Sequence, residues 1–207
     1  MTSSKLRLWE AALFLAFGLT LLTGVWSSAS QTALADQVLR LHVVANSDSA
    51  ADQALKLAVR DMVLEQAAPL LKGANSQQAA EAALLPHLDD LARAGQAVLA
   101  QAGSSDPVTV SLTDQWFPTK VYDGFSLPAG TYRALKVVIG DGAGQNWWCV
   151  VFPPLCLASV TEEVAATAAE AGLSDGQVAL ITGQDGGYVL KFKVIEWWED
   201  LLQKLGI

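Results

Sequence analysis

The chain has 207 residues, and 52% of them are hydrophobic, which is enough apolar material for one packed domain of ordinary size. Lys and Arg total 13 against 21 Asp and Glu, so the formal net charge is −8. An acidic chain with no basic cluster is a poor candidate for binding nucleic acid, because neutralising phosphates requires Lys and Arg on one face. The same composition argues against docking on anionic lipid through charge alone.

Residues 1–35 differ in composition from the rest of the chain. Lys5 and Arg7 provide a short positive start, and residues 11–26 are apolar or small throughout. A positive start followed by an apolar stretch is typical of an export signal. The apolar stretch of about 16 residues is long for a cleaved leader and short for a membrane span of roughly 20 residues.

The end of this segment offers a cleavage site. Ala33 and Ala35 satisfy the small-x-small rule for leader cleavage before Asp36. Two interpretations stay open, namely a signal peptide that is removed and a membrane anchor that is retained. Under both, we expect residues 36–207 to form one extracytoplasmic domain that meets a membrane only through residues 1–35.

The exported part is predicted to begin with a strand and a long helix. Residues 38–45 are rich in β-branched and apolar side chains, which indicates a strand. Residues 50–71 repeat apolar side chains at helical spacing. Ser49 with Asp52 three residues later resembles a helix-capping box, and Gly73 is a plausible end of the helix.

A second helical pattern covers residues 76–102, and Pro86 within it predicts a kink or a break. The period then changes to that of short strands separated by Gly-rich and Pro-rich turns. The glycines of residues 140–146 do not precede a helix, so we expect a hairpin loop there rather than a phosphate loop. The expected strands are residues 108–112, 116–122, 131–140 and 147–152, with two edge strands at 176–183 and 187–194.

Two more helices complete the prediction, one over residues 160–171 that ends at Gly172 and one over residues 194–205. Helices at the two ends of the sequence with strands between them are typical of an α+β fold. We therefore expect a single exported domain with an antiparallel sheet and with helices packed at its N- and C-terminal ends, after an N-terminal apolar leader.

Residues 144–156 concentrate the only two cysteines of the chain together with paired tryptophans and paired prolines. On one straight strand, Cys149 and Cys156 would lie roughly 23 Å apart, whereas a disulfide needs Cα atoms within about 7 Å. A bridge therefore requires the chain to reverse between them, and a cis bond at Pro154 would allow this reversal. A disulfide and a pair of buried thiols both stay open.

The two adjacent tryptophans of this stretch are expected to face opposite sides of their strand. One ring then enters the core, and the other is exposed or lies under a covering helix; alternatively both rings are covered, one by each layer. An exposed tryptophan beside a stiff proline pair is a good anchor for a partner protein. The candidate partner-binding surface consists of Asn146, Trp147, Trp148, Phe152, Pro153 and Pro154.

The residues indicate neither a catalytic constellation nor a metal or cofactor site. The only histidines are His42 and His87, and neither lies in a motif of thiol hydrolases. Two cysteines with two scattered histidines lack the spacing of a zinc site. The rival hypotheses are an exported cell-wall or thiol hydrolase that uses Cys149 with His42, and a structural protein of the envelope held by an uncleaved leader.

Two blocks of the sequence carry a resemblance to a known family. They are Leu39–Asp61, LRLHVVANSDSAADQALKLAVRD, and Phe117–Cys156, which contains the unusual pattern NWWC…FPPLC. The segment KFKVIEWWED near the C-terminus supports them, whereas residues 67–106 contribute little. Together with the leader, these blocks resemble stage II sporulation protein R of endospore-forming bacteria.

The resemblance implies a signalling protein that is not itself an enzyme. In that family the protein is made in the forespore and exported across its membrane into the space that faces the mother cell. There it triggers a membrane-embedded aspartic protease, which removes the inhibitory pro-segment of the mother-cell factor sigma-E. The resemblance supplies no partner-contact residues, so the surface within residues 146–154 is a hypothesis from residue chemistry.

Overall fold

The computed structural model describes residues 9–10, 12–19, 32–156 and 161–183. The chain divides into two compact units, residues 1–34 and residues 35–207. In the first unit, residues 12–19 are helical. None of the helices within these described ranges is both long enough and apolar enough to cross a membrane. Leader cleavage next to Ala33 and Ala35 stays a prediction.

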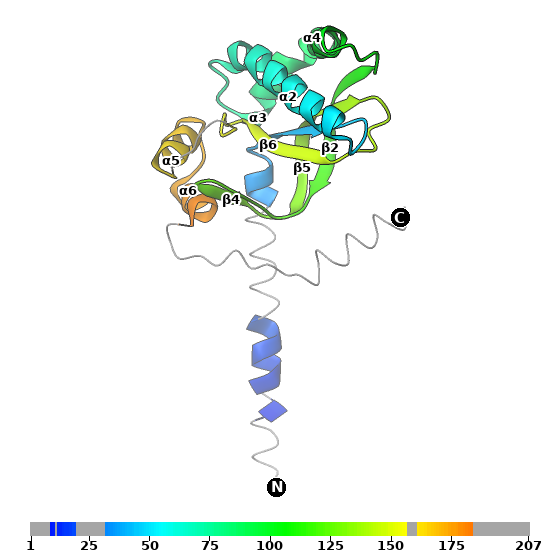
Figure 1. Cartoon of the computed structure of the whole chain (residues 1–207). Coiled ribbons are helices and arrows are strands. Elements are labelled where there is room, and N and C mark those ends of the chain that lie inside the picture. Colours follow the sequence, from blue (N-terminus) through cyan, green and yellow to red (C-terminus); the bar gives the residue numbers. More distant parts are fainter. Residues whose placement is uncertain (1–8, 11, 20–31, 157–160, 184–207) are drawn as a thin grey trace. The chain divides into compact units, whose positions relative to one another are not determined.

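A four-stranded mixed sheet forms the centre of the second unit (Figure 1). The first strand of the unit is parallel to one neighbour and antiparallel to the other. The expectation of a purely antiparallel sheet is therefore wrong for one pair of strands. In spatial order the strands are β2 (Val108–Phe117), β5 (Gly130–Ile139), β1 (Leu39–Val44) and β6 (Asn146–Phe152).

The composition of β1 and the long connection after it explain the parallel pairing. All six residues of β1 are buried, which suits a central strand covered on both faces. A parallel pair needs a crossover of a dozen or more residues, and the helices between β1 and β5 supply it. A sequence pattern identifies a strand by its period, but it does not specify which strands pair with it in the sheet.

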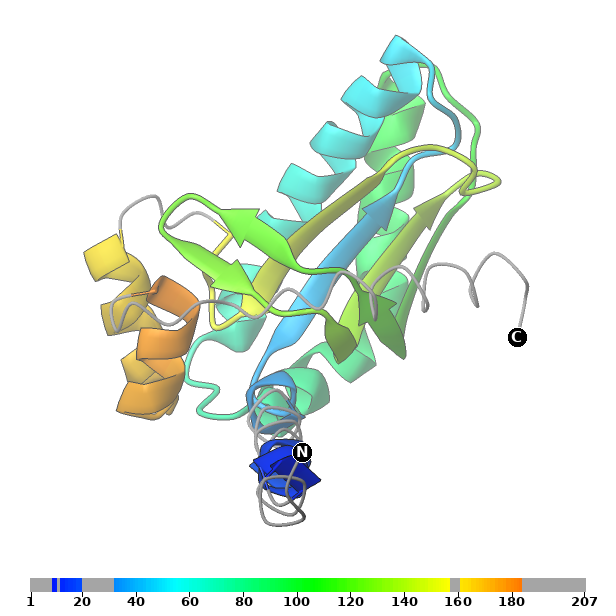
Figure 2. The same cartoon turned by 90° about the horizontal axis from the view of Figure 1, so that it is seen from below.

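Three helices cover one face of the sheet, and Figure 2 shows α2 behind the strands. The apolar side chains between these helices and the sheet form the main core. The helices are α2 (Ala50–Leu71), α3 (Gln77–Leu84) and α4 (Leu88–Gln101). The core includes Leu39, Leu41, Val43, Val59, Val63, Leu84, Leu91, Leu99, Leu135, Val137 and Cys149.

The predicted start and end of the long helix are confirmed. The Ser49 hydroxyl accepts a hydrogen bond from the Asp52 backbone N–H at 3.1 Å. The Asp52 carboxylate does not complete a capping box, because it accepts instead from the Ser47 hydroxyl at 2.5 Å and from the Asn46 amide at 3.2 Å. These hydrogen bonds, chiefly that from Ser47, lower the pKa of Asp52. At the other end, Gly73 adopts a φ of 89° that side chains disfavour.

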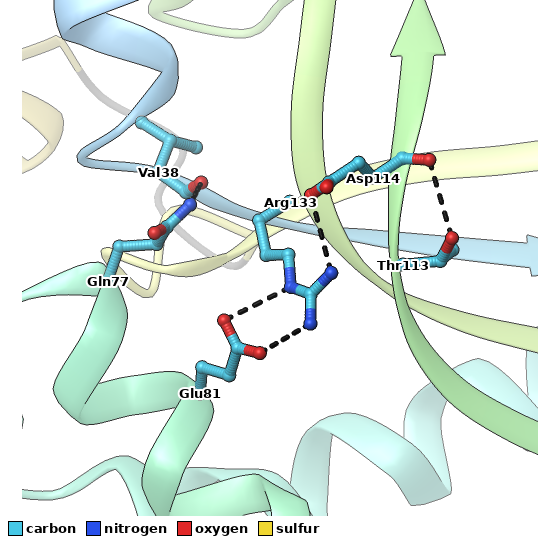
Figure 3. Close-up of polar contacts among 6 residues, drawn as sticks. All are labelled: Val38, Gln77, Glu81, Thr113, Asp114 and Arg133. Atoms are coloured by element: carbon cyan, nitrogen blue, oxygen red, sulfur yellow. Dashed lines mark hydrogen bonds and ion pairs between the residues drawn. The ribbon is translucent and has the colours of Figure 1, made fainter.

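Pro86 breaks the second helical pattern as predicted. A short 3-10 turn, η1 (Leu85–His87), separates α3 from α4. The Arg133 side chain of β5 ties α3 to the sheet through two hydrogen bonds to the Glu81 carboxylate, at 3.1 and 2.5 Å (Figure 3). Arg133 also contacts Asp114 at 3.3 Å.

A small hairpin lies over the opposite face of the sheet, in front of the strands in Figure 2. It consists of β3 (Lys120–Tyr122) and β4 (Phe125–Leu127), which among the described strands pair only with each other. The expected strand 116–122 is therefore divided, since its first two residues end β2 and its last three form β3. The segment after it contains β4 and is not only a turn, because Asp123-Gly124 is a strong two-residue hairpin signal.

Two helices follow the sheet, α5 (Thr161–Glu170) and α6 (Asp175–Thr182). The first confirms the helix predicted to end at Gly172. The second replaces the edge strand predicted at 176–183, so that prediction is wrong. Ser174 and Gln177 form a reciprocal capping box, and this local signal overrides the β-branched composition of the segment. The predicted strand 187–194 and helix 194–205 lie outside the described residues.

The loop between β5 and β6 is not a hairpin loop, because β1 lies between these two strands. The loop crosses the end of β1 and binds the segment that follows it. The backbone N–H groups of Ala143 and Gly144 donate to the carbonyls of Asn46 and Ala45 at 3.1 and 2.9 Å. A Cβ atom on Gly144 would lie 2.3 Å from the Ser47 carbonyl oxygen, so only glycine fits.

We predict that Gly144→Ala lowers the free energy of unfolding by about 1–3 kcal/mol, because the new methyl group overlaps the backbone of Ser47. The matched control is Gly176→Ala in α6, where an added Cβ meets no atom within 4 Å. There we expect no loss and a gain of up to about 1 kcal/mol. Urea denaturation measures both, and equal stabilities of the two variants would contradict the prediction.

Candidate functional site

The alternation of side chains along β1 separates two sets of chemical groups. Leu39, Leu41 and Val43 enter the helix-covered core, whereas Arg40 and His42 face the hairpin side. Cys149 pairs with Leu41 and belongs to the same core. His42 and Cys149 therefore lie on opposite faces of the sheet, and this geometry excludes the thiol–imidazole pair of the hydrolase hypothesis.

Arg40 is the largest fully buried side chain among the described residues, with 0% of its surface exposed. Its guanidinium carbon lies 4.1 Å from the ring centroid of Phe117 and 5.0 Å from that of Tyr132. The Nη2 atom donates a hydrogen bond to the Tyr122 hydroxyl at 2.5 Å. Cation–π attraction is strongest in such a desolvated setting.

Trp148 extends this cluster toward the edge of the sheet. Its ring lies 6.2 Å from Phe117, and the Lys120 ammonium sits 4.3 Å from its centroid. The side chains of the cluster come from all four strands of the sheet and from β3 of the hairpin. We call the set of Arg40, Phe117, Tyr122, Tyr132 and Trp148 the Arg40 niche.

Burial governs the protonation of the niche. It lowers the pKa of Arg40, yet a guanidinium stays charged at every physiological pH. Burial raises the pKa of Tyr122 and raises that of Tyr132 to about 12. The Tyr132 hydroxyl is neutral and donates to the Pro128 carbonyl at 2.8 Å. The niche thus holds one positive charge among neutral aromatic groups.

His42 lies beside the niche, between two amide side chains. Its Nδ1 atom is 2.9 Å from Oε1 of Gln115, and its Nε2 atom is 2.8 Å from Oδ1 of Asn146. Burial is the main cause that lowers the pKa of His42, and the charges of Lys136 and Arg40 lower it further. A neutral imidazole donates through one nitrogen only, so one of the two amides presents its NH₂ group.

We predict that His42 makes folding stability fall as the pH drops below about 6.5, its ordinary pKa. The unfolded chain binds the proton more readily than the folded chain, so this stability is fully present above that pH and is lost below it. Urea denaturation between pH 7 and pH 5.5 measures the effect. His42→Gln should have a flatter profile, and identical profiles for the two proteins would contradict the assignment.

Cys149 lies within β6, and Cys156 follows the end of that strand. Their sulfur atoms are 2.04 Å apart and their Cα atoms 5.5 Å apart, so the chain reverses between them. The cis peptide bond joins Phe152 to Pro153. The expectation of a cis bond at Pro154 is therefore wrong by one residue.

We predict that replacing both cysteines by alanine lowers the free energy of unfolding by about 2–3 kcal/mol, because a short loop is no longer closed in the unfolded chain. Urea denaturation with and without dithiothreitol measures this. The reductant should bring the unaltered protein to the stability of the double variant and leave that variant unchanged. If dithiothreitol does not change the stability of the unaltered protein, that result would argue against a disulfide between Cys149 and Cys156.

The six residues of the predicted partner-binding surface do not form one continuous surface. Trp147 is 37% exposed and lies on the helix face, where the Arg60 guanidinium is 4.4 Å from its ring. Trp148 is half-buried on the opposite face, so each ring is partly covered by a different layer. Phe152 and Pro153 are buried, and only Asn146, Trp147 and Pro154 are exposed.

Pro154 lies at a largely apolar pocket of about 490 Å³ beside the C-terminal half of α2. The pocket is continuous with the cysteine pair through Cys156. Its other lining residues are Leu64, Ala68, Pro69, Leu71, Lys72, Val150 and Val151.

Sequence reasoning missed the Arg40 niche. Arg40 was visible as a charged residue within an otherwise apolar strand, and such a residue normally faces solvent. Its burial depends on the hairpin, whose sequence lies about 80 residues further along the chain. The signal that could have located the site is the repeated occurrence of aromatic residues in 116–132.

Across the described residues, no group of three or more His, Cys, Asp or Glu side chains is placed to hold a metal ion. The fold and the site define a class: an α+β domain with a mixed sheet, a cysteine-linked edge strand and a buried guanidinium framed by aromatic rings. A family model described as stage II sporulation protein R matches residues 35–162. The chain belongs to the stage II sporulation protein R family.

One curated relative supports this membership. Stage II sporulation protein R of Bacillus subtilis (strain 168) is 31% identical over 188 residues, which cover 80% of this chain and 82% of the relative. No solved structure matches the chain.

Proposed function

We propose that this protein is an exported signal of sporulation that activates a membrane-embedded aspartic protease, which in turn processes pro-sigma-E in the mother cell. The protein would be made in the forespore and would act in the space between the two membranes. Membership of the stage II sporulation protein R family carries this proposal.

Two features of the chain agree with action outside the cytoplasm. Residues 11–26 have the composition of an export signal behind a positive start. Cys149 and Cys156 lie at disulfide distance, and disulfides persist mainly in oxidising compartments. A protein folded around this pair is suited to the space outside the membrane.

The mechanism we propose is activation by binding. A signal that binds one conformation of its receptor more tightly shifts the receptor's equilibrium toward that conformation. Trp147 is the best candidate contact on β6, because it is exposed at a sheet edge and tryptophan is enriched among residues that dominate binding energy. Asn146 and Pro154 are the other exposed members of the predicted surface.

The rival proposal, an exported thiol hydrolase, needs a free Cys149 near a base. Cys149 is linked to Cys156 and faces the core, while His42 faces the other side of the sheet. We therefore favour the signalling function.

We predict that the full chain restores pro-sigma-E processing in cells that carry the cognate protease and precursor but lack their own signal. Immunoblotting for the shortened sigma factor measures the activity. Secretion of the folded chain without any processing would refute the proposed function.

Trp147→Ala should reduce pro-sigma-E processing at least tenfold, because tryptophan is enriched among residues that dominate binding energy. Secretion and stability should stay near normal, because the Trp147 ring is partly exposed. The matched control is Trp116→Ala, which removes a half-buried tryptophan from β2 at the other edge of the sheet. Equal activity of the two variants would exclude Trp147 as a contact.

A further inference from the structure

The Arg40 niche contains an unusual concentration of hydrogen-bond donors that have no acceptor. Four buried side-chain polar atoms lack a partner in the described part of the chain, and three of them belong to this niche. They are Nε and Nη1 of Arg40 and Nε1 of Trp148. All three are N–H donors, and both side chains contact the ring of Phe117.

Buried donors without acceptors are rare in folded proteins, because each loses its hydrogen bonds to water on burial. Arg133, a half-buried arginine of the same sheet, shows how such a side chain is usually neutralised. Arg133 contacts two carboxylates, those of Glu81 and Asp114 (Figure 3). Among the described residues, Arg40 donates only to the neutral hydroxyl of Tyr122. The described part of the niche is thus short of acceptors and short of negative charge.

The surroundings of the niche add positive charge. Lys120 lies over the ring of Trp148, and Lys136 is close enough to His42 to lower its pKa. Within the described ranges, neither lysine nor Arg40 forms an ion pair. This local excess of cations occurs on a chain whose net charge is −8. An anionic group would therefore find both donors and a favourable potential here.

The hairpin controls access to Arg40. Tyr122 lies on β3, and its hydroxyl is the acceptor that the guanidinium uses. The hairpin has strands of three residues that pair with no strand of the main sheet in the part of the chain that the structure describes, so no ladder of hydrogen bonds joins the two. Displacement of Tyr122 would free a second edge of the guanidinium and open the niche toward solvent.

We propose that the Arg40 niche binds a side-chain carboxylate from an acidic peptide segment of the partner protein, with the β3–β4 hairpin as its cover. A planar guanidinium pairs with a planar carboxylate through two parallel N–H···O bonds, and the Trp148 indole supplies a third donor. The proposal rests on the proposed function only for the identity of the partner. The binding site is inferred from the unpaired donors of Arg40 and Trp148 alone.

The first test uses the full chain in a neutral detergent, with hexaglutamate as the probe and hexaglutamine as its uncharged control. Binding is followed through the indole N–H resonances of the ¹⁵N-labelled protein, and Trp148→Phe identifies the Trp148 signal. Hexaglutamate should shift that signal saturably, at least tenfold more tightly than hexaglutamine. Equal binding of the two peptides, or no shift with either, overturns the proposal.

Variants then separate recognition from general electrostatics. Arg40→Lys should weaken hexaglutamate binding at least tenfold, because lysine lacks the paired donors. Trp148→Phe keeps an aromatic ring and removes the third donor, so it should weaken binding severalfold even if Arg40 variants fold poorly. Binding to this variant is followed through the Arg40 Nε–H resonance, because the Trp148 indole signal is absent. The matched control is Arg93→Gln on α4, which removes an exposed charge and should leave binding unchanged. Equal weakening by Arg93→Gln overturns the proposal.

Tyr122→Phe gives the sharpest readout, because it removes the hydroxyl that competes for the guanidinium. Tighter hexaglutamate binding by this variant supports a displaceable cover, and unchanged or weaker binding overturns that part of the proposal. The peptide assay does not depend on sporulation. If the protein restores pro-sigma-E processing but does not bind hexaglutamate, only the carboxylate site is refuted. If it binds hexaglutamate but does not restore processing, only the proposed function is refuted.

Discussion

The alternation of side chains along β1 is the constraint on which the rest of the domain depends. This strand is buried on both faces, so successive residues, which point to opposite faces, pack in two different environments. Leu39, Leu41 and Val43 complete an apolar core against three helices. Arg40 and His42 then necessarily point to the other face, where aromatic rings and amides surround them. A shift by one residue would exchange the two sets and bury Arg40 and His42 in the apolar core.

Local signals in the sequence predicted much of the helical part of the fold. The Ser49 cap, the break at Pro86 and the end of the long helix at Gly73 each depend on residues within one turn of helix. The prediction at residues 176–183 was wrong because the β-branched composition was weighed above Ser174 and Gln177, whose capping box begins α6. In this segment the capping hydrogen bonds, and not the β-branched composition, determine the structure.

The features that depend on distant partners could not be predicted in this way. The parallel pairing of β1 with β5 joins residues such as Leu39 and Arg133, and no local pattern specifies it. For the same reason the candidate site was only partly predicted. The tryptophans and cysteines of residues 144–156 are rare residue types in the sequence, so a local pattern indicates them. Arg40 becomes a site only when β2, β5 and the hairpin bring Phe117, Tyr132 and Tyr122 around it.

The parallel pairing also sets the order in which the chain can assemble. Leu39 emerges from synthesis or translocation about 90 residues before its partner Arg133, so the contact has a long sequence separation. Until then, the helices α2, α3 and α4 can cover the apolar face of β1, but the strand lacks its parallel neighbour. The sheet therefore stays incomplete until β5 and β6, the two strands that flank β1, are available. Any process that delivers the chain from its N-terminus onward therefore completes the sheet around β1 only when residues 146–152 arrive.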